Sequence, residues 1–139
     1  MSETFSKKVE AIQKIFQDLN AESRYKAMIE MGRKLTLLPP TQKIFANIVP
    51  GCQSILYLYS ELREGKIYFH AFSEALISAG MAAILVQAYS GETPETILKI
   101  SPDFLKTIGI EGSLTPNRSH GLYHIHLRMK QDALKFLVK

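Results

Sequence analysis

Cysteine is almost absent from this sequence, which has only Cys52 in 139 residues. A single cysteine excludes a disulfide within the chain and a metal site built from several thiolates. A thiol without a partner in its own chain can stay free in a reducing compartment. We therefore expect Cys52 to be a free thiol.

Long apolar runs are also missing. The longest nearly uncharged stretch, Ala75 to Ser90, contains Ser78, Gly80 and Gln87 and is too short to span a bilayer. The first eight residues have neither the apolar core of a signal peptide nor the Arg/Ser-rich composition of a transit peptide. We expect a cytoplasmic protein that does not associate with a membrane.

No charge of one sign dominates the chain. The net charge is +4, from 17 basic and 13 acidic side chains whose signs are interleaved. The densest basic stretch, Arg128 to Lys139, belongs to an amphipathic pattern, and a solvated helix face explains it more simply than a nucleic-acid-binding patch. No glycine-rich phosphate-binding loop is present. We therefore expect no nucleic-acid partner.

Apolar spacing predicts a helical N-terminal part. Apolar residues recur at intervals of three and four over residues 5–19, which is typical of an amphipathic helix. Asn20 is suited both to end this helix and to cap a second one. Pro39-Pro40 cannot continue a helix, so residues 36–50 form an irregular segment that leads to the cysteine.

Two neighbouring stretches have the composition of β-strands. Residues 55–62 and 66–72 are rich in β-branched, aromatic and leucine side chains, and the connection between them ends in Gly65. Glycine accepts the positive φ that a tight hairpin turn requires. The sequence therefore predicts an antiparallel hairpin.

A central core helix is predicted over residues 74–89. Ser73 is suited to cap this helix, and the helix is almost uncharged after Glu74, which is typical of a buried helix. Gly80 in its middle costs up to about 1 kcal/mol relative to alanine. We therefore expect another backbone to cross closely at Gly80.

Further helices are predicted in the C-terminal half. Thr93-Pro94 and Ser101-Pro102 each place a capping hydroxyl before a proline, as at helix starts, and a last amphipathic helix follows residue 119. Helices around one hairpin define an α+β fold, with helices packed on a small antiparallel sheet. The length and ordinary globular composition indicate a single domain over 1–139.

The cysteine lies in a turn just before the first predicted strand. In Pro50-Gly51 the proline fixes φ at the first central position of a type II turn, and the glycine accepts positive φ at the second. Cys52 then leaves the turn. Its thiol is either a small buried apolar group, as free cysteines often are, or an exposed reactive group. Asn47 can hydrogen-bond the loop backbone and hold the turn.

The histidines offer alternative sites. His120 and His124 are four residues apart and share a helix face, as paired metal ligands do, whereas His126 points away from His124. No acid or thiol near them in sequence completes a metal site, so we expect no metal. A Cys–His protease would pair Cys52 with a histidine, but nothing in the sequence marks which one.

Four motifs, in the same order and spacing, resemble those of the SufE family of sulfur acceptors. One surrounds the cysteine, and the others are an Arg-Tyr helix, a Ser-acid-Ala helix start and a Leu-Thr-Pro segment. They occupy Asn47 with Gly51-Cys52-Gln53-Ser54, Arg24 to Leu35, Ser73 to Gly80, and Leu114 to Leu122. The chain differs from the family pattern in having Tyr57 for a tryptophan, Glu74 for a shorter acid and His120 for an amide.

The resemblance implies a SufE/IscU-like fold and an accessory sulfurtransferase-type role that depends on a PLP-dependent cysteine desulfurase. The partner would be of the SufS type or of the CsdA type, and the PLP belongs to that partner, so this chain has no cofactor of its own. The desulfurase holds sulfur as a persulfide, and the acceptor's cysteine carries that sulfur to an iron–sulfur cluster assembly scaffold.

The resemblance also assigns residues. Cys52 would be the nucleophile and persulfide carrier, and Glu74 would contact the desulfurase. The supporting residues would be Gly51, Gln53, Ser54, Asn47 and Arg118. Arg118 would stabilise the thiolate, hold the loop or cap a loop carbonyl.

Two other classes of function remain as alternatives. An iron–sulfur or zinc-binding scaffold-like protein would need further thiol ligands, and this chain has one cysteine. A non-catalytic interaction module would tolerate the change Cys52→Ser.

Overall fold

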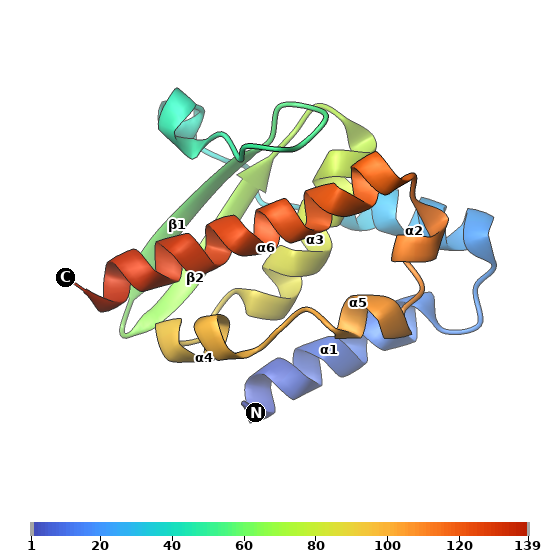
Figure 1. Cartoon of the computed structure of the whole chain (residues 1–139), viewed down its shortest axis with the longest axis horizontal. Helices are drawn as coiled ribbons and strands as arrows, with labels where there is room; N and C mark the ends of the chain where they lie inside the picture. The colour runs from blue at the N-terminus through green and yellow to red at the C-terminus, as the bar shows by residue number, and fades with distance from the viewer. Residues whose placement is uncertain (1, 139) are drawn as a thin grey trace.

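The structure of the chain is a computed structural model that describes residues 2–138. In this part of the chain, helices pack on a two-stranded antiparallel sheet (Figure 1). The helices are α1 (Glu3–Phe16), α2 (Ala21–Arg33), α3 (Leu76–Tyr89), α4 (Pro94–Lys99), α5 (Phe104–Thr107) and α6 (Pro116–Leu137). The strands are β1 (Tyr57–Arg63) and β2 (Lys66–Phe72), and the 3-10 turns are η1 (Pro40–Gln42), η2 (Phe45–Asn47) and η3 (Glu111–Ser113). The predicted α+β fold is confirmed.

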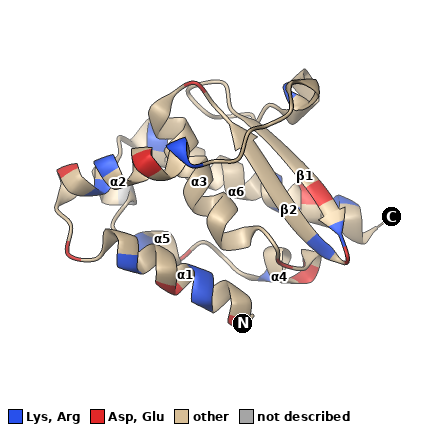
Figure 2. Ribbon diagram, turned by 180° about the vertical axis from the view of Figure 1, so that it is seen from behind, with Lys and Arg blue, Asp and Glu red and all other residues tan. Residues whose placement is uncertain are grey.

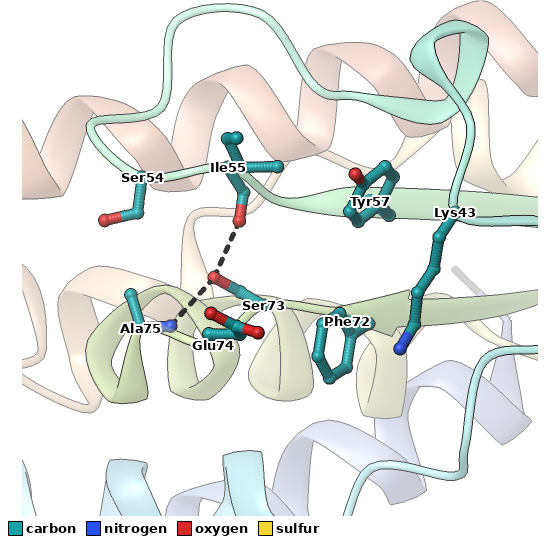
Figure 3. Close-up of a pocket in the computed structure, with 8 residues that line it drawn as sticks. All are labelled: Lys43, Ser54, Ile55, Tyr57, Phe72, Ser73, Glu74 and Ala75. Atoms are coloured by element: carbon teal, nitrogen blue, oxygen red, sulfur yellow. Dashed lines mark hydrogen bonds between the residues drawn. The ribbon is translucent and has the colours of Figure 1, made fainter. Parts of the chain in front are cut away.

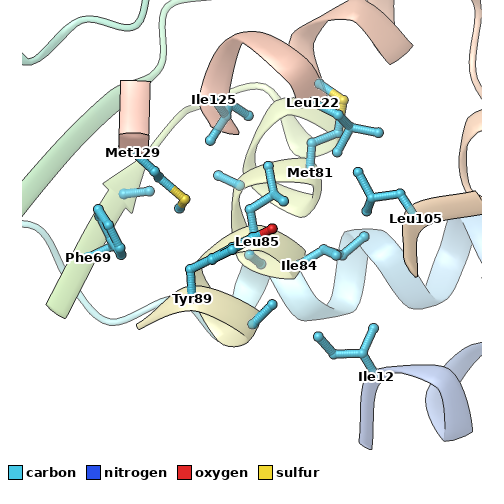
Figure 4. Packing of buried hydrophobic residues seen from close by; sticks show 14 of the residues in the cluster. Ile12, Phe69, Met81, Ile84, Leu85, Tyr89, Leu105, Leu122, Ile125 and Met129 are labelled. Carbon is cyan, nitrogen blue, oxygen red and sulfur yellow. The ribbon is translucent and has the colours of Figure 1, made fainter. Parts of the chain in front are cut away.

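Helix α3 forms the centre of the core. Most of its 14 residues are buried, and it carries no charged side chain, so its burial desolvates no ion. Helices α1, α2 and α6 and strand β2 pack around it. Figure 4 shows side chains from α1, β2 and α6 meeting those of α3. The predicted central helix is confirmed, although it begins at Leu76 rather than at Glu74.

The distribution of charge follows this arrangement. Lys and Arg alternate with Asp and Glu along α1 and α2, whereas α3 has neither (Figure 2). Within residues 2–138, no helix is both long and apolar enough to cross a membrane.

Helices α2 and α3 cross at two glycines. A Cβ atom on Gly80 would lie 2.6 Å from the carbonyl oxygen of Met28, and a Cβ atom on Gly32 would lie 2.7 Å from the backbone nitrogen of Gly80. Real Cβ atoms do not approach other atoms so closely. The close crossing predicted at Gly80 is therefore confirmed, and Gly32 is its counterpart on α2.

The hairpin has a two-residue turn. Its register runs from the pair Tyr57–Phe72 to the pair Arg63–Lys66, and the turn residues Glu64 and Gly65 have φ of 51° and 78°. Two successive positive φ values are typical of a type I′ turn, which matches the twist of the strands. The predicted hairpin is confirmed. Its first strand begins two residues later than expected, because residues 55 and 56 belong to the preceding loop.

The predicted helix caps are confirmed at two helices. The Asn20 side chain accepts a hydrogen bond from the Ser23 N–H at 2.8 Å and caps α2. The Thr93 hydroxyl accepts one from the Thr96 N–H at 3.2 Å and caps α4.

Besides α3, two further helices start differently from the prediction. Ser101 does not cap α5, because the Leu105 N–H bonds the Pro102 carbonyl in a tighter turn and the helix begins only at Phe104. Helix α6 begins at Pro116, earlier than expected. The Thr115 hydroxyl caps it by accepting a hydrogen bond from the Arg118 N–H.

Candidate functional site

The cysteine lies on a loop that backbone pairing closes at its base. The Val49 N–H donates to the Leu56 carbonyl at 2.9 Å, and residues 49–56 form what we call the cysteine loop. Gly51 has φ of 88°, the sign that a type II turn needs at its second central residue. Cys52 follows this turn, so its predicted position on a loop before the first strand is confirmed.

The thiol of Cys52 is sheltered although the turn itself is exposed. Cys52 is half-buried and packs against the hydrophobic core, and its Sγ lies 4.0 Å from the position that a Cβ on Gly121 would take. The sulfur therefore lies beside α6 at ordinary van der Waals distance from that position, and the tight neighbour of Gly121 is the Met81 Cε, at 3.0 Å. Burial raises the pKa of the Cys52 thiol, because desolvation disfavours the charged thiolate. Cys52 is thus neither fully buried nor fully exposed, and its reactivity stays a prediction.

His124 on α6 touches the cysteine loop. A Cβ atom on Gly51 would lie only 2.6 Å from its Nε2, so the glycine backbone packs against the imidazole. His120 is exposed, and within residues 2–138 no three His, Cys, Asp or Glu side chains gather as they would around a metal ion. His126 points into the core against Tyr89, and burial lowers its pKa to about 4.

Asn47 holds the segment that leads to the loop. Its Nδ2 donates to the Gln42 carbonyl at 2.8 Å and to the Gln42 side-chain oxygen at 3.1 Å. The prediction that Asn47 hydrogen-bonds loop backbone is thus confirmed. The carbonyl that Asn47 bonds belongs to Gln42 of η1, upstream of the turn.

Ser73 connects the cysteine loop to the start of α3. Its hydroxyl donates to the Ile55 carbonyl at 2.8 Å and accepts from the Ala75 N–H at 3.2 Å (Figure 3). The prediction that Ser73 caps the helix is wrong. Its oxygen bonds the residue two positions later, and α3 begins at Leu76 with Ala75 in the cap position.

A cleft of about 590 Å³ opens between the cysteine loop and the start of α3 (Figure 3). Glu74 is exposed there, and the Lys43 ammonium lies 3.7 Å from the centre of the Phe72 ring. Two apolar side chains close to this cleft, Ile55 and Leu76, are 62% and 50% exposed. The residues that line the cleft are Lys43, Ser54, Ile55, Tyr57, Phe72, Ser73, Glu74 and Ala75.

A second, smaller cleft of about 290 Å³ brings together three of the predicted supporting residues. Gln53, Ser54 and Arg118 line it with the first turns of α3. The Arg118 Nη1 donates to the Tyr25 hydroxyl at 2.6 Å, which links α6 to α2. The structure therefore places Arg118 close to the cysteine loop, with its hydrogen bond directed to α2.

Two residues near the site were not predicted from the sequence. Arg128 contacts the backbone just before the cysteine loop, and Asp132 contacts Arg128. Arg128 donates from Nη2 to the Ala46 carbonyl at 2.8 Å and from Nη1 to the Ile48 carbonyl at 3.2 Å. Its Nε donates to Asp132 at 3.1 Å. The spacing of four residues shows in the sequence that Arg128 and Asp132 can pair on one helix face. The sequence does not show that Arg128 contacts the backbone of Ala46 and Ile48.

The structure thus has a small α+β fold in which a loop beside two clefts carries one sheltered thiol. Residues 10–133 match the family model of SufE, described as an Fe-S metabolism associated domain. The match covers most of the chain, and the chain belongs to the SufE family. The resemblance seen in the four sequence motifs is thus confirmed.

Similar proteins agree with this assignment. An uncharacterized SufE-like protein of Synechocystis sp. is 34% identical over 125 residues, which are 90% of this chain and 79% of that protein. The cysteine desulfuration protein SufE of Plasmodium falciparum is 35% identical over 84% of this chain and 49% of its own length. SufE-like protein 1 of Arabidopsis thaliana, named as chloroplastic/mitochondrial, is 33% identical over 95% of this chain and 36% of its own length.

This chain thus spans about half or less of two of these relatives. The cytoplasmic location inferred from sequence stays a prediction, because the Arabidopsis relative is named for organelles.

A solved structure shares the fold. The solution structure of a hypothetical protein from Thermus thermophilus has a TM-score of 0.79 at 26% identity, and the match covers 95% of this chain and 97% of that one. The α+β architecture is therefore that of a known structure over nearly its whole length.

Proposed function

We propose that this chain is the sulfur acceptor and activator of a PLP-dependent cysteine desulfurase, of the SufS or the related CsdA type. Cys52 is the nucleophile and carries the sulfur as a persulfide to an iron–sulfur assembly scaffold. The observation that carries the proposal is the position of the chain's one thiol, within the family's Gly-Cys-Gln-Ser motif, on a loop flanked by two clefts. The name of the Plasmodium relative, a cysteine desulfuration protein, supports it.

The chemistry is one exchange step. The Cys52 thiolate attacks the terminal sulfur of the desulfurase persulfide, an S–S bond forms on Cys52, and the bond to the desulfurase sulfur breaks. The desulfurase cysteine leaves as a thiolate, so the step consumes no external oxidant or reductant. The PLP stays in the desulfurase, where it supplies the cleavage of the carbon–sulfur bond of cysteine. This chain is therefore an accessory carrier that depends on its partner.

The sheltered position of the thiol suits a carrier. A raised pKa keeps Cys52 protonated at neutral pH, and a thiol is a much weaker nucleophile than a thiolate, so reaction with solvent species is slow. The sulfur must leave the contact with α6 to reach a donor within the desulfurase. No other cysteine is present in the chain, so no resolving thiol can discharge the persulfide internally.

The docking surface proposed for the desulfurase lies around the two clefts. Ile55 and Leu76 supply exposed apolar area, and Glu74 and Arg118 supply charge of both signs. Apolar side chains surrounded by polar groups are typical of protein-binding surfaces. Gln53 and Ser54 lie on the loop between the clefts, where they would meet the partner together with Cys52.

The test is to incubate the chain with a SufS-type desulfurase, PLP and cysteine and to measure its intact mass. The chain should gain about 32 Da for each sulfur atom transferred, and a thiol reductant should remove the added mass. The Cys52→Ser variant should show no gain and no stimulation of desulfurase turnover. Its fold should persist, because serine is close to cysteine in size and the turn is exposed.

A contrary outcome would point to a different function. If Cys52→Ser still stimulates turnover fully, the chain activates the desulfurase without carrying sulfur, as a non-catalytic interaction module would.

A further inference from the structure

The segment that enters the cysteine loop is held by one side chain of α6. The Arg128 guanidinium donates to two backbone carbonyls, those of Ala46 and Ile48, which immediately precede the loop. A guanidinium presents its N–H groups in a rigid planar fork, so two bonds from one fork fix the orientation of the segment as well as its distance from the helix.

Arg128 is itself held in place by a second charged residue. Its Nε donates to Asp132, one turn further along α6, and the other Asp132 oxygen accepts a hydrogen bond from the Ser60 hydroxyl on β1. The Arg128 and Asp132 side chains are only 14% and 11% exposed, so salt screens this pair much less than a surface pair. The network thus joins β1, α6 and the entry to the cysteine loop.

The same face of α6 contacts the cysteine loop at two further points. His124 packs on Gly51, and the Cys52 sulfur lies beside Gly121, 4.0 Å from the position that a Cβ there would take. Gly121, His124 and Arg128 follow one another at intervals of three and four, so they share one helix face. As the chain runs from residue 46 to residue 52, its contacts move back along α6 from residue 128 to residue 121.

We infer that this face of α6, formed by Gly121, His124, Arg128 and Asp132, is a latch that holds the cysteine loop in its sheltered position, and that Arg128 is a positioning residue for Cys52. The inference rests on the proposed function, because it treats Cys52 as the reacting group. The latch sets how often the thiol leaves its contact with α6 and becomes accessible to a sulfur donor.

A loss of the latch has a direct consequence for the thiol. Without the Arg128 fork, two carbonyls lose their charged donor and the entry segment gains freedom, so Cys52 spends more time in water. A thiol in water ionises at a lower pH than a buried one and reacts faster.

The test measures the rate at which iodoacetamide alkylates Cys52 in the isolated chain, from pH 6 to pH 10, by intact mass. Arg128→Ala should raise the rate about tenfold at neutral pH and shift the midpoint of the pH profile toward that of the urea-unfolded chain. Arg128→Lys should give an intermediate rate, because a lysine ammonium keeps the charge but lacks the planar fork. Ser60→Ala should give a smaller increase in the same direction, since it removes one support of Asp132.

Arg24→Ala is the matched control. Arg24 is also half-buried and also donates to a backbone carbonyl, that of Leu19, and its Nε bonds Ser113, but these contacts hold other segments. It should lower the unfolding temperature without changing the alkylation profile.

Two outcomes would overturn the inference. One is that Arg128→Ala is alkylated at the wild-type rate with the wild-type pH profile, and the other is that Arg24→Ala accelerates alkylation as much as Arg128→Ala does. If Arg128→Ala fails to fold, Arg128→Lys and Ser60→Ala decide, and wild-type profiles in both would reject the latch. The assay contains no desulfurase, so a failure of sulfur transfer would contradict the proposed function and leave this result standing.

Discussion

At the scale of single residues, the state of Cys52 depends on its burial. The cause of its raised pKa is desolvation, which disfavours the thiolate. This differs from cysteines at helix N-termini or beside cations, whose thiolates are stabilised and react readily at neutral pH. In the proposed function, this state of Cys52 is the resting state of the carrier, and its reactivity increases when the loop moves the thiol into water.

The raised pKa predicts how the reactivity of wild-type Cys52 depends on pH. The rate of alkylation should rise with pH through a midpoint above that of the same chain unfolded in urea, because only the thiolate reacts. The thiolate is disfavoured in the fold, so the contribution of the buried thiol to stability should be complete below the unfolded pKa. This contribution should be lost as the pH rises through the folded pKa.

The unfolded chain serves as the internal control, because it has the same cysteine without burial. Equal midpoints for the folded and the unfolded chain would show that Cys52 is solvated in the native protein.

At the scale of the secondary-structure elements, the crossing of α2 and α3 gives the site a rigid base. The smaller cleft is lined by the first turns of α3 and the larger one by the residues just before this helix, and α3 packs closely against α2. The glycines at positions 32 and 80 allow the two backbones to approach more closely than any side chain would permit. The position of the proposed docking surface thus depends on residues that do not line it.

A substitution at the crossing should therefore destabilise the whole fold. In Gly80→Ala the new methyl group would meet the Met28 carbonyl at 2.6 Å, and we expect a loss of about 2 kcal/mol or more in the free energy of unfolding. Gly112→Ala is the control, because a Cβ there has no neighbour within 4 Å, and it should change stability by less than about 0.5 kcal/mol. Urea denaturation of both variants measures the difference, and a neutral Gly80→Ala would contradict the close crossing.

At the scale of the whole molecule, apolar side chains near the cysteine loop remain exposed in the isolated chain. Leu76 is 50% exposed at the first position of α3, next to the loop. In the proposed complex this side chain would be covered by the desulfurase. The interleaved charges seen in Figure 2 lie on α1 and α2, whereas Leu76 belongs to α3.

The change Leu76→Asp should weaken binding to the desulfurase about tenfold or more, since it places a charge in a desolvated contact. The fold should tolerate it, because an acid in the first turn of a helix interacts favourably with the helix dipole. Leu134→Asp on α6 is the control, since Leu134 is similarly exposed, at 52%, but lines neither cleft. Titration calorimetry would compare the two, and equal affinities would exclude the proposed surface.

The sequence by itself determined the features that depend on a few neighbouring residues. The cap at Asn20, the hairpin turn at Gly65, the buried helix around Gly80 and the turn before Cys52 follow from backbone preferences and from apolar periodicity. These act over a few positions and are therefore readable in the chain. The four motifs also identified the family, because their order and spacing can be read from the sequence without knowing which residues are in contact.

Only the tertiary structure decided how the thiol is held. The Ser73 hydroxyl bonds the loop at Ile55, and Arg128 bonds the carbonyl of Ile48, 80 residues away in sequence. The Cys52 sulfur lies beside Gly121 of α6. Such contacts depend on which faces of distant elements meet after the core has packed, and no local pattern specifies them. The sequence therefore indicates which residue we propose to react, whereas only the structure shows how α6 packs against the loop that carries this residue.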